Sequence, residues 1–255
     1  MAFHLVAFGM SVLTSGVLQA LTPVPDATVT ENGTLLYVPA KYNQVVAVVG
    51  QVTGNVIGQA QLHAPSLREL FFSDISPLII GQGNVGGAVV DLRFGTPMQL
   101  ETNEGLEFFS DGGGDGTTAR DAVGLVWFGD GPIQPAKGKH YKMRATSAIQ
   151  AAPLTWTNGP IQFAQTLPVG TYQIVGLRAT GGGLLAARLV FIGPSAITRP
   201  GVPGQGGITN PLINGFGTLD LGVLGSFNSI TPPSMDVFGG STNAQIYEFD
   251  LIKTA

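Results

Sequence analysis

Hydrophobic residues in this chain occur in short runs that alternate with polar residues and stop at Gly, Pro, Asn or Asp. In Ile246–Leu251, the acidic residues fall on one face and Tyr247, Phe249 and Leu251 fall on the other. A period of two with one apolar face is typical of a half-buried antiparallel strand. In Tyr172–Arg178 the same period predicts one face made by Tyr172, Ile174, Gly176 and Arg178.

Each half of the chain contains seven or eight such runs. In the second half they span 140–147, 152–157, 161–166, 172–179, 184–193, 219–227, 234–239 and 244–252. Long helical patterns are absent, and the best helix candidate is Ala64–Phe72, which Ser66 could cap. The Gly-rich segments 110–121 and 198–211 are predicted as long loops, and Gly181–Gly183 as a turn.

The two halves carry similar blocks in the same order. Paired blocks include HLVA with HYKM, TVTENG with LTWTNG, ISPLI with ITNPLI, GLEFF with SMDVF, and AVGLVWFG with QIYEFDL. Tyr42 aligns with Tyr172 in another block, and the offset between the halves changes only slowly along the chain. Chance similarity between β-rich segments is the alternative, but the conserved order favours an internal duplication.

The pattern therefore predicts an all-β protein with two domains. Residues 1–132 and 139–255 would form them, and 133–138 has the Gly, Pro and Lys content of a linker. Eight strands in about 120 residues fit a jelly roll, which packs two four-stranded sheets face to face. The predicted fold is two tandem eight-stranded jelly-roll β-sandwiches, a double jelly roll.

The opening 21 residues are apolar enough to resemble a signal peptide. They lack its positive first region, because the first Lys or Arg is Lys41. Polar residues also interrupt the run too often for a membrane span. The segment is predicted to form a pair of strands.

Composition narrows the function further. Charged residues make up 11% of the chain, against about 25% in typical domains, so much of the surface is either uncharged or covered in an assembly. A net charge of −4 with 12 Lys and Arg argues against broad nucleic-acid binding. The chain has no cysteine, which excludes disulfides and thiolate chemistry.

In its duplicated halves, strand number, length and low charge, the chain resembles the double jelly-roll major capsid proteins of adenovirus and of tailless, membrane-containing icosahedral bacteriophages such as corticoviruses and tectiviruses. The resemblance covers the whole chain and rests on architecture, because the group has no diagnostic motif. It implies a homotrimer of pseudo-hexagonal outline that tiles the capsid shell of a virion. Its partners would be neighbouring capsomers and penton, minor capsid or internal membrane components, with no direct nucleic-acid contact.

Two other functions remain open. One is a β-sandwich module that binds a receptor or a carbohydrate, and the other is a β-sandwich hydrolase. The chain contains no G-x-S-x-G elbow, no H-E-x-x-H motif and no Walker loop, so we expect no enzyme activity and no cofactor.

Three acidic residues separated by glycines, Asp111, Asp115 and Asp121, are candidate calcium ligands, since Ca²⁺ takes six to eight oxygens. Their spacing fits neither an EF-hand nor the nonapeptide calcium repeat well, and a solvated hairpin loop is the alternative.

A basic cluster opens the second half, and its members Lys137, Lys139, Lys142 and Arg144 are candidate assembly contacts. The cluster could bind carboxylates of another subunit or anionic lipid. The alternative is a strand edge that lysines protect against mispairing.

Aromatic and imidazole residues give weaker signals. Trp127 and Trp156 are predicted core residues, with an exposed platform for sugars as the alternative. His4 and His140 occupy equivalent positions in the two halves, but one histidine per domain makes a poor metal site.

Overall fold

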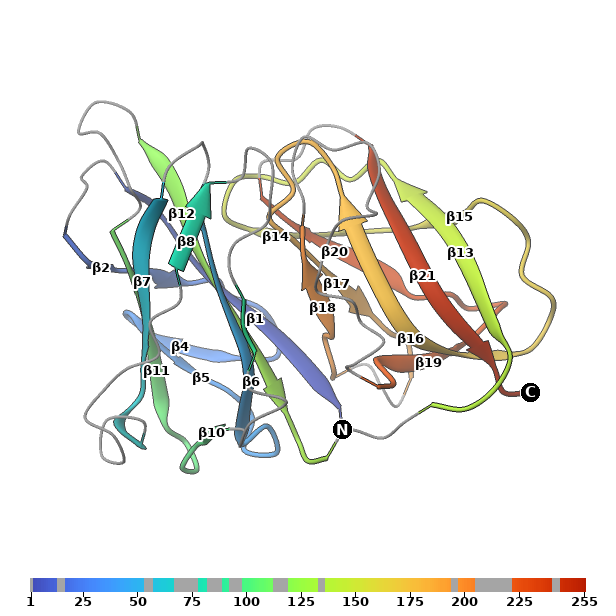
Figure 1. The fold of residues 1–255 in the computed structure, drawn as a ribbon, viewed down its shortest axis with the longest axis horizontal. Helices are drawn as coiled ribbons and strands as arrows, with labels where there is room; N and C mark the ends of the chain where they lie inside the picture. The colour runs from blue at the N-terminus through green and yellow to red at the C-terminus, as the bar shows by residue number, and fades with distance from the viewer. Residues whose placement is uncertain are drawn as a thin grey trace. The chain divides into compact units, whose positions relative to one another are not determined.

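The computed structural model describes residues 2–12, 17–52, 57–66, 78–81, 89–91, 98–111, 119–132, 136–193, 197–204, 222–239 and 244–255. These residues form an all-β protein with several sheets, as the strand pattern predicted (Figure 1). The chain divides into two compact units: the N-terminal unit is Leu5–Asp130, and the C-terminal unit is Gly131–Ala255 together with Met1–His4.

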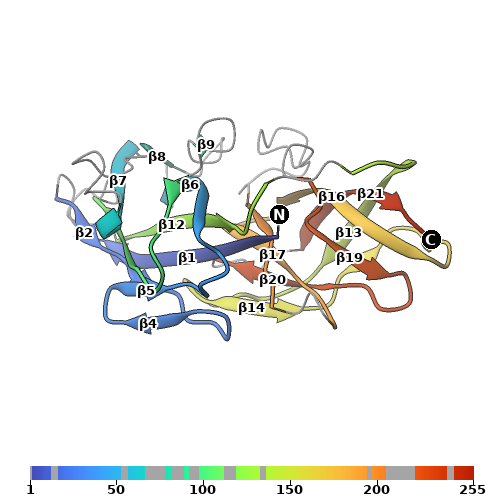
Figure 2. The same ribbon diagram turned by 90° about the horizontal axis from the view of Figure 1, so that it is seen from below.

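The described part of the C-terminal unit contains two antiparallel sheets, whose strands are drawn in yellow-green to red in Figures 1 and 2. The five-stranded sheet has the order β15 (Gln162–Phe163), β13 (His140–Ser147), β21 (Gln245–Lys253), β16 (Thr171–Thr180), β19 (Gly225–Asn228). The four-stranded sheet has the order β14 (Trp156–Gly159), β20 (Ser234–Phe238), β17 (Ala186–Val190), β18 (Gly201–Pro203).

The described strands of the N-terminal unit follow a similar plan. One row is β1 (Phe3–Val12), β12 (Arg120–Gly129), β6 (Gln44–Val52), β10 (Met98–Gln99). The other row is β5 (Leu35–Tyr37), β11 (Gly105–Ser110), β7 (Ile57–His63), β8 (Leu78–Gly81). Four short described strands extend these rows. β3 (Thr22–Pro23) pairs with β1, β2 (Gln19–Ala20) with β11, β4 (Thr30–Asn32) with β5, and β9 (Val89–Asp91) with β6. β8 also pairs in parallel with β6 and so joins the two rows.

Both units use the same set of strand pairings. In the C-terminal unit the pairs are nested, from the ends of the sequence inward: β13 with β21, β14 with β20, β16 with β19, and β17 with β18. Two further pairings, β16 with β21 and β17 with β20, join the nested pairs into sheets. In the N-terminal unit the nested pairs are β1 with β12, β5 with β11, β6 with β10, and β7 with β8, and the joining pairs are β6 with β12 and β7 with β11.

A bulge recurs at nearly the same place in both units. In β16 the register against β21 skips Val175, and in β6 the register against β12 skips Val46. Each bulge lies a few residues after an aligned tyrosine, Tyr42 or Tyr172, and both tyrosines are buried. An extra residue reverses the direction of the side chains that follow it.

The bulge overturns one prediction about β16. Tyr172 and Ile174 face the core, but the next core positions are Val175 and Leu177, so the core face changes from even-numbered to odd-numbered residues at the bulge. Gly176 and Arg178 therefore lie on the opposite face from Tyr172. In β21 the predicted alternation is confirmed, because Tyr247, Phe249 and Leu251 are all fully buried.

Other segments differ from the predictions in detail. The opening segment contains strands, but they do not pair with each other: β1 pairs with β3 and β12, and β2 pairs with β11. β18 lies inside the predicted loop 198–211, where Gly and Pro concealed a three-residue strand. In the N-terminal unit the strand equivalent to β14 is β5, which begins two residues after the end of the aligned TVTENG block. ISPLI (apart from its last two residues), ITNPLI and most of the candidate helix lie outside the described residues.

Buried hydrogen bonds hold the start of β21 against the end of β13. The Ser147 hydroxyl donates to Gln245 Oε1 at 2.6 Å, and its oxygen lies 2.9 Å from the Tyr247 hydroxyl. Gln245 also binds both backbone groups of Ile149. Burial raises the pKa of the Tyr247 phenol, and the hydrogen bond with Ser147 offsets only part of this rise. The network thus keeps a neutral phenol in the core.

Candidate interaction surface

Charged side chains line the outer face of the five-stranded sheet, in two cross-strand rows. Lys142 of β13 lies opposite Asp250 of β21. In the next row, Glu248 of β21 lies between Arg144 of β13 and Arg178 of β16. Directly opposite residues share a face, with Cβ atoms about 5 Å apart. Segments about 100 residues apart in the sequence therefore build one surface, here called the charged face.

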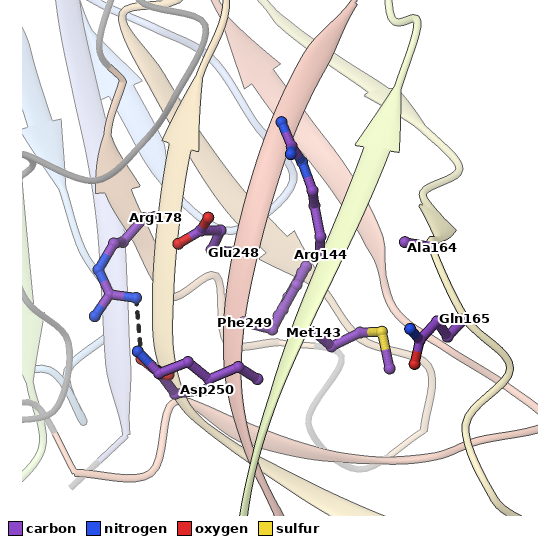
Figure 3. Close-up of a pocket in the computed structure, with 9 residues that line it drawn as sticks. Met143, Arg144, Ala164, Gln165, Arg178, Glu248, Phe249 and Asp250 are labelled. Atoms are coloured by element: carbon purple, nitrogen blue, oxygen red, sulfur yellow. Dashed lines mark ion pairs between the residues drawn. The ribbon is translucent and has the colours of Figure 1, made fainter.

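A depression of about 390 Å³ lies over the charged face (Figure 3). It is lined by Lys142, Met143, Arg144, Ala164, Gln165, Arg178, Glu248, Phe249 and Asp250. Lysine, arginine and carboxylate groups dominate this lining, and none of these residues is a serine, threonine, cysteine or histidine. The lining of the depression can therefore bind charged groups.

Asp250 is the buried centre of the charged face. Its carboxylate is almost inaccessible to solvent and lies 3.1 Å from Arg178 Nη1 and 3.9 Å from Lys142 Nζ. The side chain rests directly on Gly176, where a Cβ atom would overlap the carboxylate. Gly176 therefore makes room for Asp250, and the bulge at Val175 turns Arg178 toward it.

The charges of Arg144 and Glu248 are not paired with the charges of other described residues. Arg144 is exposed and Glu248 is half-buried, and neither forms an ion pair with another described residue. In Figure 3 the Arg144 guanidinium extends away from Asp250. Its five N–H donors are thus free to bind a partner's carboxylate.

The structure brings together only part of the predicted basic cluster. Lys142 and Arg144 lie on the charged face, whereas Lys137 precedes β13 and is exposed. The Lys139 ammonium lies 5.3 Å from the centre of the Tyr141 ring. The alternating exposure along β13 shows that its cations project from one face of a paired strand. On its other side, β13 pairs with β15 at only two positions, so among the described residues part of this edge is unpaired.

A second charged cluster was missed by the sequence analysis. Arg188 of β17 and Asp236 of β20 are both buried, with Arg188 Nε 2.9 Å from Asp236 Oδ2. Asn158 donates to the other carboxylate oxygen at 2.8 Å. The Arg188 guanidinium stacks on Trp156, 3.9 Å from the ring centre. The only signal in the sequence was an arginine inside the apolar run 184–193.

The two tryptophans have different surroundings. Trp127 is fully buried, as predicted. Trp156 is half-buried, with Arg188 on its ring and Phe238 at 5.0 Å between ring centres. Because Arg188 occupies a face of the Trp156 ring, that face is not an open platform for a sugar.

The calcium hypothesis is not tested by the structure, because Asp115 lies outside the described residues. Asp111 accepts a bond from the backbone N–H of Gln59 at 2.9 Å, and Asp121 accepts one from the Ser11 hydroxyl at 2.7 Å. Within the described ranges, no group of three or more histidine and acidic side chains is placed to bind a metal.

Smaller predictions have the following outcomes. His4 is buried and His140 is exposed, each on the first long strand of its sheet. Gly181–Gly183 does form a turn, with Leu184 N donating to Gly181 O at 3.1 Å and Gly183 at a φ of 72°. Across the described part of the chain, no helix has the length and apolar character needed to cross a bilayer.

Comparisons with known proteins complete this description. No protein-family model matches the chain, and no curated protein matches it. Among solved structures, it is similar to the crystal structure of the major capsid protein P2 from bacteriophage PM2, with 8% sequence identity and a TM-score of 0.23 over 97% of each chain. These values are too low to assign a fold or a family, so the functional argument rests on the strand pairings and the charged face.

Proposed function

We propose that this chain is a structural capsid protein of the double jelly-roll type. It assembles as a homotrimer of pseudo-hexagonal outline and tiles the icosahedral shell of a virion. Its work is assembly rather than catalysis. Its partners are further copies in neighbouring capsomers, together with penton, minor capsid or internal membrane components.

The observation that carries this proposal is the nested pairing in both units. If eight strands first form one long antiparallel ribbon, strand 1 pairs with strand 8, 2 with 7, 3 with 6, and 4 with 5. Rolling up such a ribbon adds the pairings 8 with 3 and 7 with 4, which produces the two sheets of a jelly roll. The described strands of each unit contain all six pairings.

The presence of this pairing scheme in both units links the fold to the proposed trimer. Three copies of a chain with two similar units supply six similar units, which suit a pseudo-hexagonal tile. The low charged content is consistent with such a tile, because subunit contacts cover much of its surface. Each contact can be weak, since many contacts act together in a shell.

Light scattering of the purified protein tests the proposal. We expect a particle of three times the 26.4 kDa chain mass, and sheets or shells in electron micrographs of concentrated samples. A stable monomer that binds glycans on an array would contradict the proposal and favour a β-sandwich binding module. Hydrolysis of an ester or glycoside that one Asp or Glu substitution abolishes would favour an enzyme.

A further inference from the structure

The two units carry opposite net charge. Residues 1–130 contain 4 of the 12 Lys and Arg and 12 of the 16 Asp and Glu, so their net charge is −8. Residues 131–255 contain the other 8 basic and 4 acidic residues, so their net charge is +4. The overall value of −4 therefore conceals a strongly polarised chain. Such polarity favours contact between unlike units and disfavours contact between like units.

The positive charge of the C-terminal unit is concentrated near β13. Lys142, Arg144 and Arg178 outnumber the two carboxylates of the charged face, and Lys137 and Lys139 come just before them in the sequence. Of those carboxylates, Asp250 is already paired with Arg178. Arg144 is exposed without an ion-pair partner among the described residues, so it can add a partner's carboxylate without breaking an existing contact.

The N-terminal unit supplies exposed carboxylates, whose charge is opposite to that of the basic cluster. Glu31 lies on the edge strand β4, and Glu101 lies between β10 and β11. Both are exposed. The described surface of this unit has few cations to neutralise them, and Lys41 is its exposed lysine.

We propose that the charged face of one copy binds the acidic N-terminal unit of a second copy. This inference rests on the proposed self-association and adds which surfaces make the contact. The contact is head-to-tail, because each copy offers its basic unit to one neighbour and its acidic unit to another. Head-to-tail contacts that close produce a cyclic oligomer, and a closed ring of three alternates acidic and basic units.

Two single charge reversals test the contact, because each changes the net charge by the same amount. Arg144→Glu removes the free guanidinium from the charged face, whereas Lys41→Glu makes the N-terminal unit more acidic. Sedimentation equilibrium is expected to show association about tenfold weaker or more for Arg144→Glu, and no weakening for Lys41→Glu. Unchanged circular dichroism and thermal midpoint would show that both variants are folded.

A variant of the acidic N-terminal unit and a change of salt concentration test the same contact. Glu31→Lys combined with Glu101→Lys is expected to weaken association as Arg144→Glu does. Raising NaCl from about 0.15 M to about 1 M is expected to weaken association of the wild type more than that of Arg144→Glu, since the screening length falls from about 8 Å to about 3 Å. If only Arg144→Glu loses association, the face binds another surface and the inference is wrong.

The remaining outcomes separate this inference from the proposed function. A wild-type trimer that Arg144→Glu leaves intact contradicts the inference alone. A wild-type monomer contradicts both. Binding to vesicles of phosphatidylcholine and phosphatidylserine that Arg144→Glu abolishes, with self-association unchanged, assigns the charged face to lipid and overturns the inference.

Discussion

At the scale of single residues, the charged face depends on Gly176. The Asp250 carboxylate occupies the space that a side chain at Gly176 would fill, and Arg178 approaches it at 3.1 Å. Removing one partner of a buried ion pair costs about 3–5 kcal/mol, because the other charge stays buried. Gly176 therefore supports the ion pair between Asp250 and Arg178, because it leaves space for the Asp250 carboxylate.

Substituting Gly176→Ala is expected to lower the free energy of unfolding by about 1–3 kcal/mol, the usual cost of overpacking. Urea denaturation measures this loss. Gly181→Ala is the matched control, because the nearest atom to its Cβ would be the Gln245 Cγ at 3.2 Å, whereas a Cβ at Gly176 would overlap the Asp250 carboxylate. Equal losses in the two variants would show that the Asp250 contact is unimportant.

At the scale of elements, β21 holds the C-terminal unit together. It pairs with β13 on one side and with β16 on the other, over eight positions each. In the described part of the chain, β15 pairs only with β13 and at two positions. A central strand has ladder bonds on both sides, so it tolerates changes to its backbone least.

Proline substitutions test this difference. Ile246→Pro in β21 is expected to unfold the C-terminal unit, because proline lacks an N–H and is excluded from central strands. Ile246 lies outside the aromatic core, so the effect would come mainly from the backbone. Gln162→Pro in the edge strand β15 is expected to change the thermal midpoint little. Similar midpoints for both variants, measured by circular dichroism, would contradict the assignment of β21 as the central strand.

At the scale of the whole molecule, the chain consists of two units that repeat one pairing scheme. The strands that pair lie within one unit, apart from Phe3 and His4 at the start of β1, which belong to the C-terminal unit. Because the strands of each half pair with one another, each half can form its own hydrophobic core. The same feature places an acidic and a basic unit on one chain, which is the basis of the proposed head-to-tail assembly.

A fragment of residues 131–255 is therefore expected to fold alone, with a β-type circular dichroism spectrum and one cooperative thermal transition. A fragment of residues 131–243 is the control. It lacks β21 and with it the pairings of β13 and β16 along the centre of the sheet, so it is expected to be unfolded. Resistance to limited proteolysis distinguishes the two fragments. An unfolded 131–255 fragment would show that the unit needs the rest of the chain.

Much of the strand content was predictable from local patterns. The alternation in 246–251 identified the buried face of β21, and Trp127 was correctly assigned to the core. The SMDVF and GLEFF blocks, aligned from sequence, lie in β20 and β11, which occupy the same place in their sheets. These features depend on side-chain period and hydrophobicity, which neighbouring residues carry by themselves.

The candidate site followed from the sequence only in part. Lys142 and Arg144 were identified as a basic cluster, but their neighbours Arg178, Glu248 and Asp250 were not. The register of β13, β21 and β16 decides which residues share a row, and register depends on pairing between distant segments. The same reason conceals the partner of Arg188, since Asp236 lies 48 residues further along the chain.

The β class, the core faces of regular strands and the repeated order of blocks can be predicted from the sequence alone, because a period of two is a local property. The bulge at Val175, which places Gly176 and Arg178 on the outer face, arises only when the strands pair. A bulge forms where one strand must match the register of another, and no period within a single strand records that match. The charged face of β13, β16 and β21 is therefore a property of strand pairing rather than of any one segment.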